Sequence, residues 1–128
     1  MINRPETRDL LTEARRVLLD SLASELDGER KYEALMIANA MGMAIREQEL
    51  REAGESEATD VMLSRFLAGH ALTEEPGQGE QTLARALRER VIDGGDHELR
   101  GVLRAMTETR LKVNNPGYLK KLQQSRMV

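Results

Sequence analysis

Apolar residues dominate one stretch of the chain, from Ala34 to Ile45, in which Asn39 is the only side chain with strong hydrogen-bonding needs. A surface helix carries a single apolar stripe, whereas a helix that is apolar on nearly all sides is typical of a protein core. The stretch is too short to cross a bilayer, which takes about 20 residues. The pattern therefore predicts a central helix over residues 29–53, ended by Gly54, and no contact with a membrane.

Amphipathic helices are predicted on both sides of this central helix, because apolar residues recur there at spacings of three and four. The first helix begins near Pro5 and continues to about Leu26. It ends at Gly28, since glycine is common just beyond a helix end. Ser56 and Asp96 are suited to cap the third and fifth helices through their side-chain oxygens.

The predicted fold is all-α, because no segment alternates with the period of two that a half-buried strand would show. A fourth helix carries Leu83, Leu87 and Val91, and residues 114–117 break the fifth helix before a final short turn. The chain has 128 residues and no cysteine, a length that can bury a core without disulfides or metals. We expect a single helical domain over residues 1–128, a bundle of about five helices around the central helix.

Charge is unevenly distributed along the chain. Residues 1–80 carry 9 basic and 17 acidic side chains, whereas residues 81–128 carry 10 basic and 5 acidic ones. The two parts could attract each other within one fold or across a dimer, or the later part could bind an anion or an acidic partner. Nucleic acid is not expected, because the net charge is −3 and only 2% of the residues are aromatic. The N-terminus shows no apolar signal segment, so we expect a cytoplasmic protein.

The motifs indicate no catalytic residue, no metal ligands and no cofactor, and they do not identify cofactor-binding residues. Neither His70 nor His97 is preceded by the glutamate, three residues earlier, that di-iron helical bundles use. The glycines between Glu74 and Gly79 are not followed by the Lys-Ser/Thr pair of a phosphate-binding loop. The sequence therefore favours a protein that is not an enzyme.

Three polar residues occupy positions where the pattern predicts burial: Glu33, Asn39 and Arg110. Asn39 lies inside the apolar helix, and Arg110 lies on the apolar stripe of the fifth helix. A buried amide needs hydrogen bonds, and a buried guanidinium needs a carboxylate, a carbonyl or an anionic ligand. Glu33 is a candidate partner by its helical position. Both a structural and a functional role stay open for these residues.

Basic and amide side chains also gather around the break after the fifth helix. A helix terminus leaves free backbone amides, which can donate to an anion. This region could be a capped helix end with a solvated tail, or a surface for an acidic protein or a phosphate-bearing ligand. The candidate surface comprises Arg110, Lys112, Asn114, Asn115, Tyr118, Lys120 and Lys121.

Three segments together resemble an uncharacterised bacterial family of small all-helical proteins, a domain of unknown function. The segments are Arg4-Pro5 ahead of Leu10-Leu11, Tyr32 to Ala40, and Val113 to Leu119. Members of that family are often encoded near acyl-CoA dehydrogenases and aminoglycoside-phosphotransferase-like kinases. The resemblance implies a role beside such enzymes and brings no catalytic residues with it.

Two functions follow as hypotheses. The first is a non-catalytic accessory or interaction protein that serves a neighbouring enzyme as a homodimer, because a helix that is apolar on all sides has to be covered. The alternative is a small-molecule binding module for an anionic metabolite such as a CoA ester.

Overall fold

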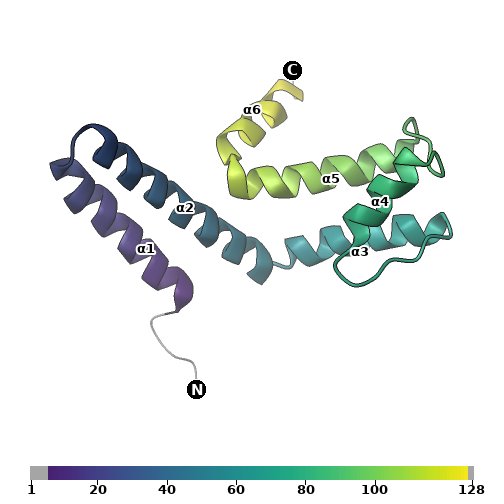
Figure 1. The fold of residues 1–128 in the computed structure, drawn as a ribbon, viewed down its shortest axis with the longest axis horizontal. Helices are drawn as coiled ribbons and strands as arrows, with labels where there is room; N and C mark the ends of the chain where they lie inside the picture. The colour runs from purple at the N-terminus through teal and green to yellow at the C-terminus, as the bar shows by residue number, and fades with distance from the viewer. Residues whose placement is uncertain (1–5, 127–128) are drawn as a thin grey trace. The chain divides into compact units, whose positions relative to one another are not determined.

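The structure is a computed structural model that describes residues 6–126, and within this range it is all-α (Figure 1). The predicted fold class is confirmed. Arg4 and Pro5, which the sequence placed at the start of the first helix, lie outside the described residues. The α-helices are α1 (Thr7–Val17), α2 (Gly28–Glu52), α3 (Glu55–Gly69), α4 (Gly79–Arg88), α5 (His97–Asn114) and α6 (Pro116–Arg126).

Contacts along the chain divide it into two compact units: unit 1, residues 1–52, and unit 2, residues 53–128. Unit 1 contains α1 and α2, and unit 2 contains α3 to α6. The expected single domain over residues 1–128 stays a prediction. Among residues 6–126, no helix combines the length and the hydropathy that crossing a bilayer requires.

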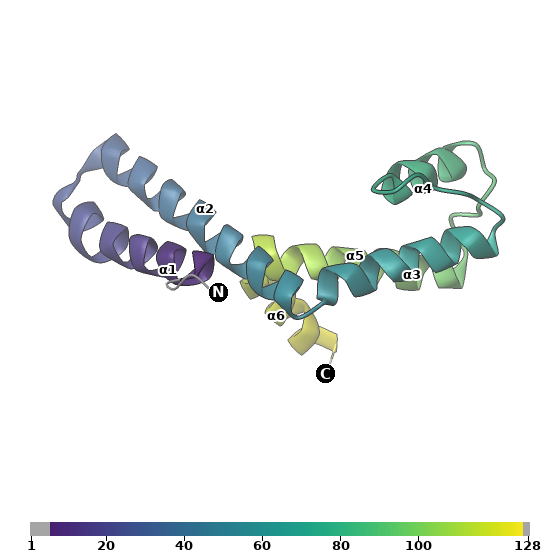
Figure 2. The ribbon, with the colours of Figure 1, turned by 90° about the horizontal axis from the view of Figure 1, so that it is seen from below.

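Unit 1 is an antiparallel pair of helices, and α1 and α2 lie side by side in two perpendicular views (Figures 1 and 2). The first helix continues beyond α1 as one π-helical turn, η1 (Leu18–Leu22), and a short 3-10 turn, η2 (Ala23–Glu25). The chain then reverses, and α2 begins at Gly28, whose φ of 57° is left-handed. Glycine adopts this conformation without the steric penalty of a Cβ atom, so the predicted stop at this position is confirmed.

The two helices of unit 1 are joined through small residues on α2. Ala34, Ala38 and Gly42 are spaced by four residues, share one side of α2 and are buried. Arg15 of α1 donates from Nε to the backbone oxygen of Ala38 at 3.0 Å. A Cβ atom on Gly42 would lie 3.3 Å from this same Nε atom, so the absence of a side chain makes room for the guanidinium.

The burial of α2 differs from the sequence prediction. The helix has the expected extent, but it is buried along one side only. Leu35, Met36 and Ile37 leave 45%, 54% and 51% of their surface exposed, and Tyr32 leaves 64%. The buried apolar residues of unit 1 are three alanines: Ala23, Ala34 and Ala38. Among the described residues, unit 1 therefore buries no large apolar side chain.

The main core lies in unit 2, where α3 packs along α5 and α4 packs on α3 (Figure 1). Leu67 of α3 and Leu99 of α5 have 0% and 1% of their surface exposed, and Phe66 has 2%. The core cluster consists of Leu63, Phe66, Leu67, Leu83, Ala86, Ile92, Leu99 and Val102. Unit 2 thus has the large buried side chains that unit 1 lacks.

Some predicted helix boundaries in unit 2 are confirmed and others are wrong. Asp96 caps α5, and its Oδ1 accepts a hydrogen bond from the Leu99 amide at 3.0 Å. Ser56 does not cap α3, because that helix already begins after Gly54, which takes a φ of 75°. Helix α4 ends at Arg88, so Val91 lies beyond it and is 56% exposed.

Candidate functional site

The break between α5 and α6 is capped by its own side chains. Asn115 accepts a hydrogen bond through Oδ1 from the backbone amide of Tyr118 at 3.1 Å. Pro116 occupies the first position of α6, where the missing amide hydrogen costs nothing. The short final turn expected from the sequence is in fact a helix that extends to Arg126. Asn115 therefore caps the start of α6, and the backbone amide of Tyr118, which could have donated to an anion, already has a partner.

Two of the four predicted cations make ion pairs inside unit 2. Arg110 of α5 pairs with Glu80 of α4, and Lys112 donates from Nζ to an oxygen of Glu55 on α3 at 2.6 Å. The hydrogen bond from Glu80, together with its negative charge, raises the pKa of Arg110 above its usual value. Both pairs join the basic C-terminal part of the sequence to its acidic N-terminal part. Two of the 10 basic side chains after residue 80 are therefore paired with acidic residues from the earlier part of the chain.

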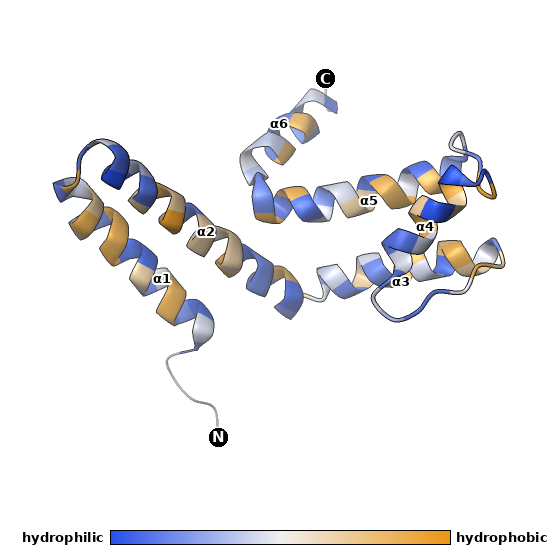
Figure 3. Ribbon diagram, viewed as in Figure 1, coloured by the Kyte–Doolittle hydropathy of each residue, from blue (hydrophilic) through white to orange (hydrophobic). Residues whose placement is uncertain are grey.

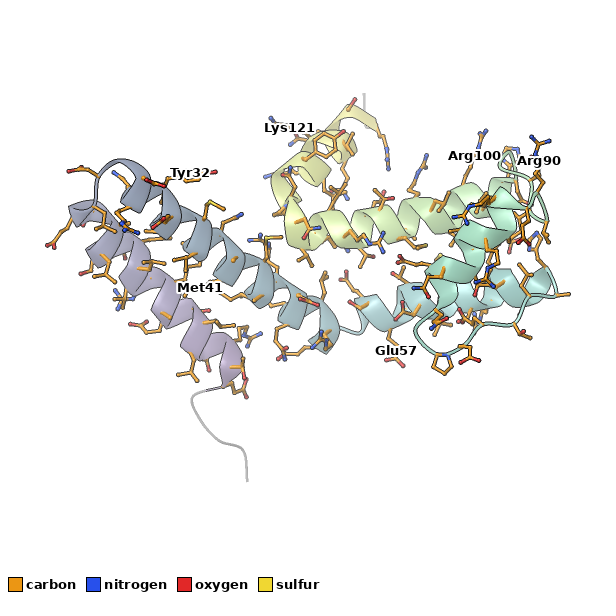
Figure 4. All side chains as sticks on the ribbon, in the orientation of Figure 1. Tyr32, Met41, Glu57, Arg90, Arg100 and Lys121 are labelled. Carbon is orange, nitrogen blue, oxygen red and sulfur yellow. The ribbon has the colours of Figure 1, made fainter. Side chains whose placement is uncertain are left out.

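The remaining members of the candidate surface are exposed on α6 and at the end of α5. Lys120 and Lys121 are exposed, Tyr118 leaves 50% of its surface exposed, and Asn114 is also exposed. Figure 4 shows Lys121 projecting from α6. Within the described range, neither lysine takes part in an ion pair. The free positive charge of the candidate surface is thus reduced to these two residues, while unit 2 as a whole has 11 basic and 11 acidic side chains.

The predicted burial of Glu33, Asn39 and Arg110 is wrong. All three residues are exposed, and no polar or charged side chain is buried within residues 6–126. Glu33 pairs with Arg30 one turn earlier at 2.9 Å. The side chain of Arg110 is 60% exposed because its length carries the guanidinium from the apolar stripe outward to Glu80. Neither Asn39 nor Arg110 is therefore a buried polar group, although Arg110 lines a small pocket of about 170 Å³ together with Glu80.

Two hollows in unit 2 were not predicted from the sequence. An apolar groove of about 520 Å³ lies between α3 and α5, and its lining includes Val61, Met62 and Gly101. A polar pocket of about 400 Å³ adjoins the start of α4 and includes Asp60 and Glu74. Glu74 accepts a hydrogen bond from the hydroxyl of Ser64, which ties the loop before α4 to α3. In the described part of the chain, no group of acidic or histidine side chains is arranged to hold a metal ion.

Both helices of unit 1 contain apolar residues, as the hydropathy colouring shows (Figure 3), and several of these residues form an exposed apolar surface. Leu10 and Val17 of α1 are 57% and 40% exposed, and Ile37 of α2 is 51% exposed. The sequence held a signal for this surface, because α1 and η1 together have more apolar positions than one buried stripe can use. Leu11, Leu18 and Leu19 are half-buried, while Leu10, Ala14 and Val17 are exposed.

The comparisons with known proteins give a family and no activity. A sequence model of the family described as a domain of unknown function (DUF6285) matches residues 24–118, from the turn before α2 to the first turn of α6. No curated protein matches the chain. No solved structure matches it either.

Proposed function

We propose that this chain, which belongs to the DUF6285 family, is a non-catalytic interaction protein that serves a neighbouring enzyme. The observation that carries the proposal is the state of unit 1, whose buried apolar residues are alanines while Leu10, Met36 and Ile37 are at least half exposed. A surface of this kind is typical of a binding site for another protein.

The enzyme that this protein serves is proposed from the sequence resemblance. An acyl-CoA dehydrogenase or an aminoglycoside-phosphotransferase-like kinase is the candidate, and the action takes place in the cytoplasm with the protein as a homodimer. The exposed Lys120 and Lys121, beside Tyr118, are the proposed contact for an acidic surface of that enzyme. Charge of this kind steers association and sets its salt dependence.

Affinity purification of the tagged full chain from its source organism tests the proposal. Co-purification of one of these two enzymes, in a fixed ratio to the chain, is the expected result. The matched control is the same chain with Lys120→Glu and Lys121→Glu, which should retain less of the enzyme at equal expression. Recovery of neither enzyme under mild salt would contradict the accessory role.

The alternative function is a binding module for an anionic metabolite such as a CoA ester. Its support is the same exposed lysine pair, because Arg110 and Lys112 are already paired with Glu80 and Glu55. Native mass spectrometry of the purified chain distinguishes the two functions. A bound species with the mass of a CoA ester, displaced by added CoA, would favour the alternative over the interaction protein.

A further inference from the structure

The apolar surface of unit 1 has contributions from both of its helices, and these form one continuous face. Leu10, Ala14 and Val17 follow one another at spacings of four and three along α1, so they share one side of that helix. Ile37, Met41 and Ala44 do the same along α2. The helical wheel of an antiparallel pair puts these two stripes on the same side of the hairpin. Figure 3 shows that both helices contain apolar residues. We call these six residues the hairpin face.

We expect unit 1 to be unstable as an isolated pair of helices. Burial of a large apolar side chain contributes about 1.5–3 kcal/mol, and unit 1 obtains none of this in full from its leucines, methionines or isoleucines. A helix pair is normally completed by a second layer of helices. We propose that a second copy of the chain supplies that layer: the hairpin faces of two chains pack together into a four-helix bundle. This inference rests on the homodimer of the proposed function and assigns its interface.

The dimensions of the hairpin face suit a second copy. The first helix, from residue 7 to residue 22, is about 24 Å long at 1.5 Å per residue, and two adjacent helices are about 20 Å wide. The projected area is about 500 Å², and the corrugated helix surface exceeds its projection. A small specific interface buries about 600 Å² on each partner. Two α-helical hairpins stacked in this way form the up-and-down arrangement of four-helix bundles.

The charges around the hairpin face also favour a copy of itself. On α2 the face is bordered by two ion pairs, Arg30 with Glu33 at 2.9 Å and Arg51 with Glu47 at 3.3 Å. On α1 the face is flanked by Glu13, which lies three residues after Leu10 and four before Val17 and pairs with Arg16. Each of these borders is an ion pair, so two identical faces meet without strong repulsion. A strongly charged partner would instead favour a face whose bordering residues all carry the opposite charge.

Sedimentation of the full chain over a range of concentrations tests the interface. We expect a dimer whose dissociation constant rises at least about 100-fold in Ile37→Lys, because the ammonium group would be desolvated in an apolar interface. Met36→Lys is the matched control. It changes the adjacent residue, which is exposed to a similar degree, 54% against 51%, but lies about a quarter-turn away from the hairpin face. Its dissociation constant should stay close to that of the unchanged chain.

Single cysteines provide a second readout, because the natural chain has none. Ala14→Cys, on the hairpin face, should form a disulfide-linked dimer under mild oxidation, whereas Thr12→Cys, on another side of α1, should not. A dimer that is indifferent to Ile37→Lys and forms no Ala14→Cys disulfide would overturn this interface and leave the homodimer intact. A monomer at high micromolar concentration would overturn both. The accessory role has its own test, because an enzyme that co-purifies with a monomeric chain would still support it.

Discussion

Leu67 has no exposed surface and lies in the core of unit 2. We expect Leu67→Ala to lower the free energy of unfolding of unit 2 by about 2–5 kcal/mol, because the substitution removes buried methyl groups and leaves a cavity. Leu103→Ala is the control, since Leu103 on α5 is 39% exposed, and it should cost less than about 1 kcal/mol. Urea denaturation of the full chain, followed by circular dichroism, measures both. Equal losses in the two variants would contradict the position of the core.

Gly42 is the residue on which the contact between α1 and α2 depends. Gly42→Leu should destabilise unit 1 by about 1–3 kcal/mol, because a side chain there overlaps the guanidinium of Arg15 and breaks its hydrogen bond to Ala38. Gly101→Leu is the same change on α5, at a position with open space around it. That control should be neutral or stabilise the helix by up to about 1 kcal/mol. Thermal unfolding at one fixed concentration compares the two, and a loss in both would contradict the explanation.

At the scale of single residues, the sequence predicted well where a residue lies on its helix. It predicted poorly which other residues cover that residue or pair with it. It placed Arg110 on the apolar stripe of its helix, but its partner Glu80 is 30 residues away, and no local pattern indicates that pairing. Asn39 was expected to be buried because its neighbours are apolar. Whether a side chain is covered depends on the elements packed around it, and a helix with apolar residues on all sides does not reveal which side is covered.

At the scale of elements, the start of α5 offers a direct test of helix capping. Asp96→Ala should cost about 0.5–2 kcal/mol, because the amide of Leu99 loses its acceptor, while Asp96→Asn keeps an oxygen in place and should cost much less. Ser56→Ala should have almost no effect on α3, whose preceding residue is Gly54. Chemical denaturation of the three variants measures these differences. A large loss in Ser56→Ala would contradict the observed boundary.

The ends of helices were predictable where one residue determines them. Gly28 and Gly54 adopt positive φ angles of 57° and 75°, and their sequence signal needs no tertiary information. The end of α4 was not predictable, because the turn that follows the helix is made by Arg90. Its φ is 59°, and no glycine or proline is present there to indicate such a turn. Val91 continues the helical spacing of the apolar residues of α4, but it lies beyond the end of that helix. Packing of Ile92 into the core explains why the chain turns at this point.

For the whole molecule, the two units should differ in their ability to fold alone. We expect a fragment of residues 53–128 to unfold cooperatively, because it keeps the entire core cluster. A fragment of residues 1–52 should be largely unfolded when dilute, since it buries only alanines. Circular dichroism of each fragment over a range of concentrations checks both outcomes. Concentration-independent helicity in the shorter fragment would contradict the absence of an independent core.

The proposed partner surface can be tested on the intact chain. If Lys120 and Lys121 contact an acidic enzyme, the affinity should fall as salt rises, and the double change to glutamate should weaken binding without loss of helicity. Arg16→Glu is a control that reverses one exposed charge in unit 1. Binding curves at several ionic strengths, measured with the enzyme that co-purifies, give the result. If the affinity changes neither with salt nor with the lysine substitutions, Lys120 and Lys121 are only solvated residues of α6.

The lack of large buried side chains in unit 1 also affects when this unit folds during synthesis. Protein synthesis delivers unit 1 before unit 2, and domains generally fold in the order in which they emerge. Here the earlier segment has nothing large to bury, whereas unit 2 gains its core as soon as α3, α4 and α5 are complete. Folding should therefore proceed in the reverse of the order of synthesis. Unit 1 of the newly synthesised chain would remain exposed to proteases and chaperones until it binds the unit 1 of a second, completed chain.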